Sequence, residues 1–158
     1  MDSHSLTLIG ALALLLAMSA YFSATETAFT SLNRIRIKNM AQSGNRRARL
    51  ALELTENYDK LLSTILIGNN VVNIASASLS TVIFTSYFGK NGVTISTVVM
   101  TALVLLFGEI SPKSMAKEAP ERFAMFAAPF LKGLMALLTP LNWLFMQWKK
   151  FVSHFFRH

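Results

Sequence analysis

The residues with the clearest chemical potential lie between Leu103 and Lys113, where an apolar run ends in Gly-Glu-Ile-Ser-Pro-Lys. A carboxylate such as Glu109 at the end of a membrane-length apolar run is costly, which indicates a functional role. Pro112 has no N–H, so in a helix the carbonyl four residues earlier, on Gly108, loses its partner. A free carbonyl beside a carboxylate suits a hard cation. The motif therefore predicts a cation site around Glu109, with a backbone oxygen from Gly108.

Hydroxyl side chains crowd the second half of the first apolar segment. Ser19, Ser23, Thr27 and Thr30 follow one another at spacings of three and four, so they share one face of a helix. A single Ser or Thr usually bonds the carbonyl four residues earlier or joins two helices. A whole polar face directed into a helix bundle fits a cation site better, and we assign Ser19 and Ser23 to that site.

The centre of the second apolar segment reads Gly68-Asn-Asn-Val-Val-Asn73. Three Asn side chains are expensive in lipid unless each amide is satisfied, and Gly68 permits a break or a close backbone approach. The pattern favours Asn70 and Asn73 as ligands, whereas Asn69 fits a ligand or an interhelical hydrogen bond equally well. Gly68 joins Gly108 as a candidate donor of a backbone oxygen.

These polar groups fall at similar depths. At about 1.5 Å per residue and a hydrocarbon core of about 30 Å, Ser19 and Ser23 lie about 20 and 25 Å from the outer edge. Glu109 lies about 24 Å from that edge, and Asn70 and Asn73 lie about 14 and 18 Å from the inner edge. All of them are expected between the midplane and the inner interface.

The composition is that of a membrane protein. Of 158 residues, 53% are hydrophobic and 15% charged, and the mean hydropathy is +0.43. Residues 61–89 and 93–108 carry no charge, and residues 6–33 carry only Glu26. The net charge of +7 does not indicate a nucleic-acid partner, because the basic residues flank apolar segments and suit cytoplasmic loops and anionic lipids. The absence of cysteine excludes disulfides and thiolate metal sites.

We therefore predict an all-α membrane protein that forms one ion-transport domain. The residues 34–49 hold six Lys/Arg and no acid, which places them in the cytoplasm and the N-terminus outside. Two short helices are expected there, broken at Ser43-Gly44. The predicted organisation is three transmembrane segments (1–33, 58–88, 93–117), cytoplasmic juxtamembrane helices (34–57) and an interfacial belt (118–158).

The last segment admits two topologies. Residues 123–148 are long enough to cross, and hydropathy alone predicts a fourth span. The basic residues that follow favour the cytoplasm, and Pro129 and Pro140 interrupt the run. We predict a broken helix at the inner interface with Trp143 and Trp148 as anchors, which leaves the C-terminus cytoplasmic.

Three motifs in order, Ser19-x-x-x-Ser23-Ala-Thr-Glu-Thr-Ala-Phe29, the Asn-rich centre and Gly108-Glu-Ile-Ser-Pro-Lys113, resemble the transmembrane domain of the CorC/cyclin-M magnesium transporter family. The resemblance covers nearly the whole chain. It implies three transmembrane helices, a belt, a homodimer in the inner (plasma) membrane, and export of Mg²⁺ with Na⁺ as counter-ion. It also implies Glu109, Ser19, Ser23 and either Asn70 or Asn73 as ligands. The family's regulatory CBS modules have no counterpart in these residues, so nucleotide regulation is not carried over.

The expected mechanism is alternating access around a site of low formal charge. Mg²⁺ requires a rigid octahedron of oxygens, and one carboxylate with neutral oxygens can also release it and accept Na⁺. A non-transporting Mg²⁺ sensor and a divalent-cation channel remain alternatives. An intramembrane enzyme with a serine nucleophile is disfavoured, because all three histidines lie near the termini. Glu26 is expected to pair with a Lys or Arg, and a role in Na⁺ coupling stays open.

Overall fold

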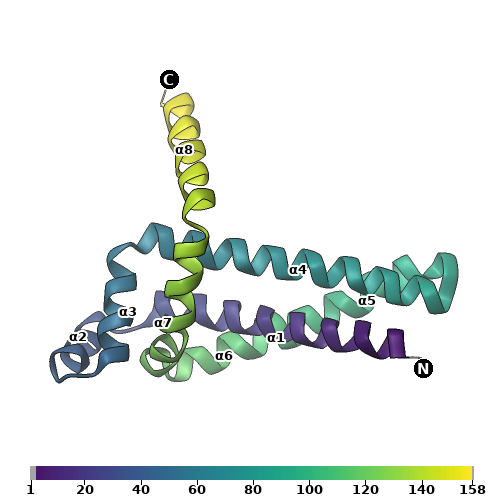
Figure 1. The fold of residues 1–158 in the computed structure, drawn as a ribbon, viewed down its shortest axis with the longest axis horizontal. Helices are drawn as coiled ribbons and strands as arrows, with labels where there is room; N and C mark the ends of the chain where they lie inside the picture. Colours follow the sequence, from purple (N-terminus) through teal and green to yellow (C-terminus); the bar gives the residue numbers. More distant parts are fainter. Residues whose placement is uncertain (1–2, 158) are drawn as a thin grey trace.

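The computed structural model describes residues 3–157, and within that range the chain is helical throughout, with no strand (Figure 1). The first helix, α1 (Ser3–Ser31), follows the first apolar run. The expected ends of the first and last segments, residues 1, 2 and 158, lie outside the described residues. Buried side chains of α1 begin at Ser19, so the other helices cover only its second half.

The two short helices predicted after the first apolar segment are present as α2 (Arg34–Gln42) and α3 (Arg46–Glu56). The side-chain oxygens of Asn33 and Asn45 each accept from the backbone N–H three residues later, which caps the two helix starts. Between the helices, Gly44 has a φ of 99°, which is a conformation that favours glycine. The predicted break at Ser43-Gly44 is therefore confirmed.

The second apolar segment forms α4 (Tyr58–Phe88), and a 3₁₀ turn (Gly89–Asn91) reverses the chain into α5 (Gly92–Leu103). Figure 1 shows α5 running back along α4. The hydroxyls of Ser80 on α4 and Ser96 on α5 lie 2.7 Å apart and are both buried. The small side chains of Ser80 and Ser96 thus allow α4 and α5 to pack closely.

The chain does not leave the helix at Pro112. A π-helical segment (Val104–Ile110) follows α5 and leads directly into α6 (Ser111–Glu118). The Ser111 N–H donates to the Leu106 carbonyl, five residues earlier, which is the π-helical pattern. Pro112 therefore does not break the helix, which widens before the proline and then continues through it.

Two helical stretches are long and apolar enough to cross a membrane, namely α1 and the unbroken run Tyr58–Glu118. The second stretch has 61 residues and reverses at its 3₁₀ turn, so it contains both the second and the third predicted segments. The helices α7 (Pro120–Leu137) and α8 (Thr139–Phe156) meet the same criteria only as a pair, and they are bent by 74°.

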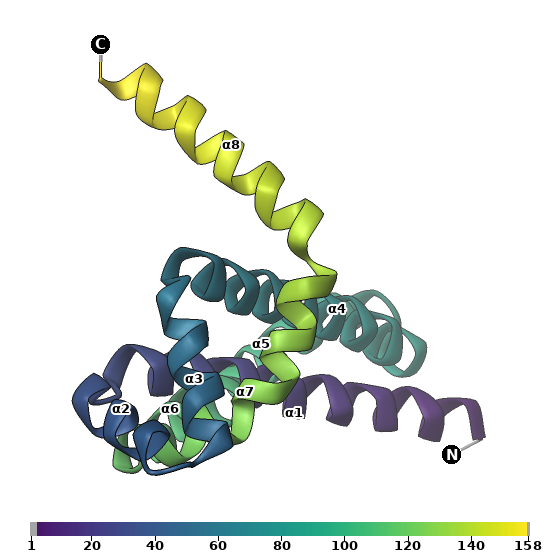
Figure 2. The ribbon, with the colours of Figure 1, turned by 60° about the vertical axis from the view of Figure 1, so that its left-hand side comes forward.

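Helix α7 lies across the others rather than along them. It packs on α1, α3 and α4, and Figures 1 and 2 show it crosswise to α1 and α4. The bend comes at Leu138, directly before Thr139-Pro140, whereas Pro129 lies inside α7. Helix α8 leaves the body of the molecule from the part of α4 near Thr64, to which Asn142 donates a hydrogen bond of 2.9 Å.

A buried carboxylate joins α7 to the α1–α2 junction. Glu121 is only 8% exposed, and its Oε1 accepts from the Asn33 N–H and from Arg36 Nη1, both at 3.3 Å. Such a carboxylate near a helix start needs these charge-assisted partners. This contact holds the first turn of α7 against the α1–α2 junction. Helix α1 also packs against α4, α6 and the π segment.

Candidate metal centre

Most hydroxyl groups in the bundle bond within their own helix. Thr25, Thr64 and Ser76 each donate to the carbonyl oxygen four residues earlier, at 2.6, 2.8 and 2.8 Å respectively. This is the ordinary behaviour of Ser and Thr in apolar helices. Ser19 and Ser23 differ, because both are fully buried and both reach side chains of other helices. They are therefore the two hydroxyls of α1 that take part in an interhelical polar cluster.

The cluster joins α1, α4 and the π segment. Ser23 Oγ donates to Glu109 Oε1 at 3.3 Å, and Ser19 Oγ donates to Asn73 Oδ1 at 2.7 Å. Asn73 Nδ2 lies 3.5 Å from Asn69 Oδ1, one turn earlier on α4. The structure thus brings together Ser19, Ser23, Asn73 and Glu109. Asn69 supports Asn73 from within α4, so this hydrogen bond is not the interhelical one that was an expected role of Asn69.

Asn70 stands apart from this cluster. Its side chain is exposed on α4, whereas Asn73 is partly buried and bonded to Ser19. Sequence reasoning could not separate the two because both lie on faces that can turn toward the bundle. Of the two, Asn73 has the position of a ligand, and the ligand role itself stays a prediction for every member of the cluster.

Both candidate glycines lie where backbone and side chain approach closely. A methyl group on Gly108 would lie 2.8 Å from Ser19 Oγ, and one on Gly68 would lie 2.5 Å from a carbon of the Phe22 ring. An alanine at either position would therefore force the neighbouring side chain to move. The contribution of either carbonyl oxygen to a metal stays a prediction, and the contact at Gly108 is the one that lies within the cluster.

Lys113 is a member of the cluster that sequence reasoning missed. Its Nζ lies 3.3 Å from Glu109 Oε2, four residues away on the same helical run. The Lys113 side chain is 41% exposed and that of Glu109 is 27% exposed. The i,i+4 spacing of the two residues was the available signal. Glu109 thus divides its two oxygens between the Ser23 hydroxyl and the Lys113 ammonium.

The chemistry of the cluster is that of one carboxylate among neutral oxygens. Within residues 3–157, no three His, Cys, Asp or Glu side chains come together in a way that could hold a metal ion. Hydroxyl, amide and carboxylate oxygens fit Mg²⁺ or Na⁺ better than softer metals.

Glu26 forms no ion pair in the described part of the chain, so its expected pairing with a Lys or Arg is not found.

Comparison with known proteins identifies the family. Residues 9–157 match the family described as "Cyclin M transmembrane N-terminal domain". The chain belongs to this cyclin M family. The chain is 43% identical over 127 residues to the UPF0053 inner membrane protein YfjD of Escherichia coli, which covers 80% of the chain and 30% of that relative. It is 42% identical over 145 residues to a UPF0053 protein of Haemophilus influenzae, covering 91% of the chain and 34% of the relative.

A more distant relative has a more informative name. The Polyamine export protein of Escherichia coli is 25% identical over 144 residues, which covers 83% of the chain and 32% of that protein. The cyclin M domain described here spans about a third of the length of these curated relatives.

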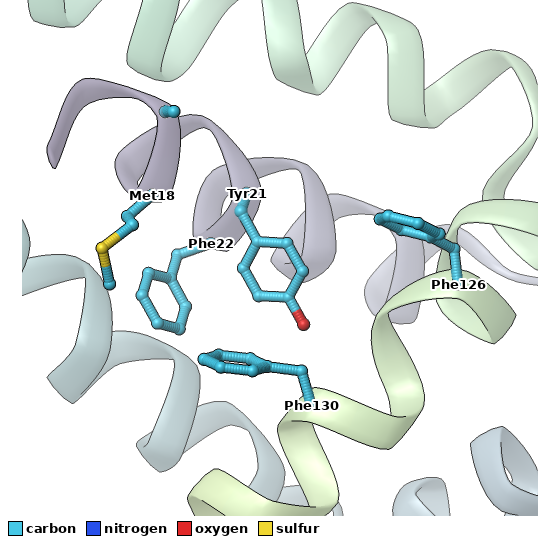
Figure 3. A pocket seen from close by; sticks show the side chains of 6 residues that line it. Met18, Tyr21, Phe22, Phe126 and Phe130 are labelled. Atoms are coloured by element: carbon cyan, nitrogen blue, oxygen red, sulfur yellow. The ribbon is translucent and has the colours of Figure 1, made fainter. Parts of the chain in front are cut away.

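The cyclin M domain also has an apolar cavity of about 360 Å³ between α1 and α7. Figure 3 shows Tyr21 and Phe22 of α1 facing Phe126 and Phe130 of α7 across it. The Tyr21 hydroxyl donates to the Ala127 carbonyl at 2.9 Å, which holds α7 across α1. No carboxylate lines this cavity, so it does not offer the oxygen ligands of a cation site.

Proposed function

We propose that this domain carries Mg²⁺ across the membrane, with Glu109 as its charged ligand and Ser19, Ser23 and Asn73 as neutral ligands. The observation that supports this most is the convergence of these four side chains from three separate helical segments. A site shared between segments can open and close when the segments move, whereas a site on one helix cannot. This is the requirement of alternating access.

The low charge of the site fits a transported ion better than a resident one. With one carboxylate, the site does not neutralise Mg²⁺, so the ion is held loosely enough to leave. Na⁺ can use the same oxygens, and we propose Na⁺ entry as the process that drives Mg²⁺ export. The substrate stays hydrated in part, because the cluster supplies fewer oxygens than the six that Mg²⁺ requires.

The proposed topology has three transmembrane helices, an outer N-terminus and a cytoplasmic C-terminus. It places α2 and α3 in the cytoplasm because of their many Lys and Arg residues. The crosswise position of α7 supports its role as a belt at the inner interface of an inner (plasma) membrane. By analogy with the family, we propose a homodimer, and a regulatory CBS module in the longer protein.

Helix α8 has the pattern of a helix that lies on a membrane surface. At 100° per residue, Lys149, Lys150 and Arg157 share one side with His154. The opposite side is apolar and aromatic, and most of it is exposed. Basic and aromatic faces on opposite sides of one helix are typical of interfacial helices. The members of the apolar side are Leu141, Leu144, Phe145, Trp148, Phe151, Val152 and Phe155.

The test is Mg²⁺ flux in proteoliposomes that contain only the purified domain and a Mg²⁺-sensitive dye. We expect Glu109→Ala to abolish the flux because the site loses its only charged ligand. Glu118→Ala is the matched control, since Glu118 is an exposed carboxylate at the end of α6. Unaltered flux in Glu109→Ala would remove the basis of this proposal.

The same assay separates the alternatives. Wild-type protein that binds Mg²⁺ but shows no flux without a partner would be a sensor rather than a transporter. Flux that does not saturate with Mg²⁺ and ignores an imposed Na⁺ gradient would indicate a divalent-cation channel.

A second candidate substrate is an alkyl ammonium compound such as a polyamine. It is favoured by the contact of Glu109 with the ammonium group of Lys113, which is itself a primary alkyl ammonium. It also agrees with the name of one relative, Polyamine export protein. A polyamine has several charged groups and needs further anions at a distance, whereas Glu109 is the one carboxylate in the cluster. Uptake of labelled spermidine by the same proteoliposomes, and competition with Mg²⁺, discriminates between the two substrates.

A further inference from the structure

We infer that Lys113 is a tethered cation, which neutralises Glu109 when no Mg²⁺ is bound to it and gives way when Mg²⁺ binds. The inference rests on the proposed function, because it concerns the exchange at the same carboxylate. Its direct basis is the 3.3 Å contact between Lys113 Nζ and Glu109 Oε2, while Ser23 Oγ holds Oε1. The ammonium group therefore lies where a cation coordinated by Oε2 would have to approach.

The other oxygens of the cluster are also satisfied within the protein. Ser19 donates to Asn73 Oδ1 at 2.7 Å, and Asn73 donates to Asn69 Oδ1 at 3.5 Å. In this arrangement the cluster meets its hydrogen-bonding needs with its own side chains, and Lys113 supplies the positive charge. Binding of Mg²⁺ must then displace the ammonium group from Oε2 and turn the neutral oxygens toward the metal.

Lys113 has the properties that such an exchange requires. Its side chain is 41% exposed, so the ammonium can move from Glu109 into water without crossing the packed bundle. Lysine carries a compact charge on a flexible stem, unlike the rigid fork of arginine that binds a carboxylate at two points. A tether also gives the ammonium a high effective concentration at the carboxylate, so a weak pair forms readily and still exchanges.

The exchange keeps the Glu109 carboxylate paired with a cation throughout transport. A bare carboxylate inside a membrane protein is costly, and that cost would oppose any movement of the site after Mg²⁺ has left. With the ammonium in contact, the carboxylate stays paired in that step. When Mg²⁺ binds, two like-charged cations at one carboxylate repel each other, which drives the ammonium away. Lys113 therefore lowers the affinity for Mg²⁺ and thereby eases its release.

The first test follows the Lys113 amine directly. The purified domain is treated briefly with an amine-acylating reagent, and modification of Lys113 and of Lys117 is quantified by mass spectrometry. Lys117 is the matched control, because it is an exposed lysine one turn further along α6. We expect Mg²⁺ to raise Lys113 modification about two- to fivefold, the range for exposed ion pairs, and to leave Lys117 unchanged. Glu109→Gln should raise Lys113 modification without Mg²⁺ and remove its response to Mg²⁺.

The outcomes separate this inference from the proposed function. Wild-type levels of Lys113 modification in Glu109→Gln overturn the ion pair and with it the inference. If Mg²⁺ leaves Lys113 modification unchanged while Mg²⁺ flux still depends on Glu109, the tethered-cation exchange is wrong and the transport proposal stands. If the domain shows no Mg²⁺ flux and Mg²⁺ also leaves Lys113 modification unchanged, the proposed substrate is wrong.

The second test measures Mg²⁺ affinity by titration calorimetry. Lys113→Met removes the charge and keeps the stem, and we expect the dissociation constant to fall about two- to fivefold. Lys113→Arg keeps the charge and should bind Mg²⁺ no more tightly than the wild type, and Lys117→Met should not differ from it. An unchanged or weaker affinity in Lys113→Met overturns the inference.

Discussion

Replacement of Gly108 by alanine tests the centre of the cluster with a single methyl group. The added carbon would lie 2.8 Å from Ser19 Oγ and 3.5 Å from Ser19 Cβ. The first distance is well inside van der Waals contact, so the Ser19 hydroxyl has to move. Since Ser19 is fully buried and bonded to Asn73 at 2.7 Å, its movement breaks that hydrogen bond.

The expected effects on stability and on binding differ. Loss of the hydrogen bond costs about 1 kcal/mol, and a buried group left without a partner brings the cost to about 1–3 kcal/mol. Alanine is better than glycine in a helix by about 1 kcal/mol, which offsets part of this cost. The folded protein should therefore lose no more than about 2 kcal/mol. The Mg²⁺ site loses a ligand position, and we expect its affinity to fall about tenfold or more, equivalent to about 1.4 kcal/mol.

The assay is titration calorimetry with Mg²⁺, together with thermal unfolding in the same detergent. Gly133→Ala is the control, because Gly133 lies in α7 with no atom within 4 Å of an added methyl group. In a Ser19→Ala background the clash with the hydroxyl is absent, so Gly108→Ala should cost little further affinity. Wild-type Mg²⁺ affinity in Gly108→Ala, or full additivity with Ser19→Ala, would refute the reasoning.

Three further predictions concern other parts of the molecule. Asn73→Ala should weaken Mg²⁺ binding about tenfold while Asn70→Ala stays within about twofold, since only the former contacts Ser19; equal effects in calorimetry would contradict the placement. Gly68→Ala should destabilise the fold by about 1–3 kcal/mol in thermal unfolding, because the methyl group meets the buried Phe22 ring at 2.5 Å. In a Trp143→Phe variant, the fluorescence of Trp148 should be quenched most strongly by lipids that carry bromine near the headgroup. Strongest quenching by bromine deep in the acyl chains would argue for an α8 that spans the membrane.

The helices could be predicted from the sequence because their signals are local. Long runs without charge set α1 and the α4–α5 pair, and Asn33 and Asn45 each supply a helix cap. Depth along a helix is also a local quantity, since it follows from counting residues. The similar depths of Ser19, Ser23 and Glu109 were enough to predict that these residues lie close together.

The remaining features depend on the rotation of one helix against another, which spacing alone does not determine. The choice between Asn70 and Asn73 required the direction of each side chain. The π segment was not predicted, because the sequence signal, Pro112, lies after the residues at which the helix widens. The role of Glu121 was missed as well, since its partners Asn33 and Arg36 come from a distant part of the chain.

The π segment has a consequence for which insertions and deletions this chain can accept. A π turn holds one residue more than the α turn it replaces, so Val104–Ile110 contains one residue of slack. Deletion of a residue such as Leu105 would let the stretch return to regular α-helix, which is the better hydrogen-bonded form. Because this deletion removes only the extra residue of the π turn, Glu109 would keep its direction toward Ser23, whereas a deletion in the regular turns of α5 would rotate Glu109 by about 100°. The π segment can therefore lose one residue without a change in the direction of the Glu109 carboxylate, which the neighbouring regular turns cannot do.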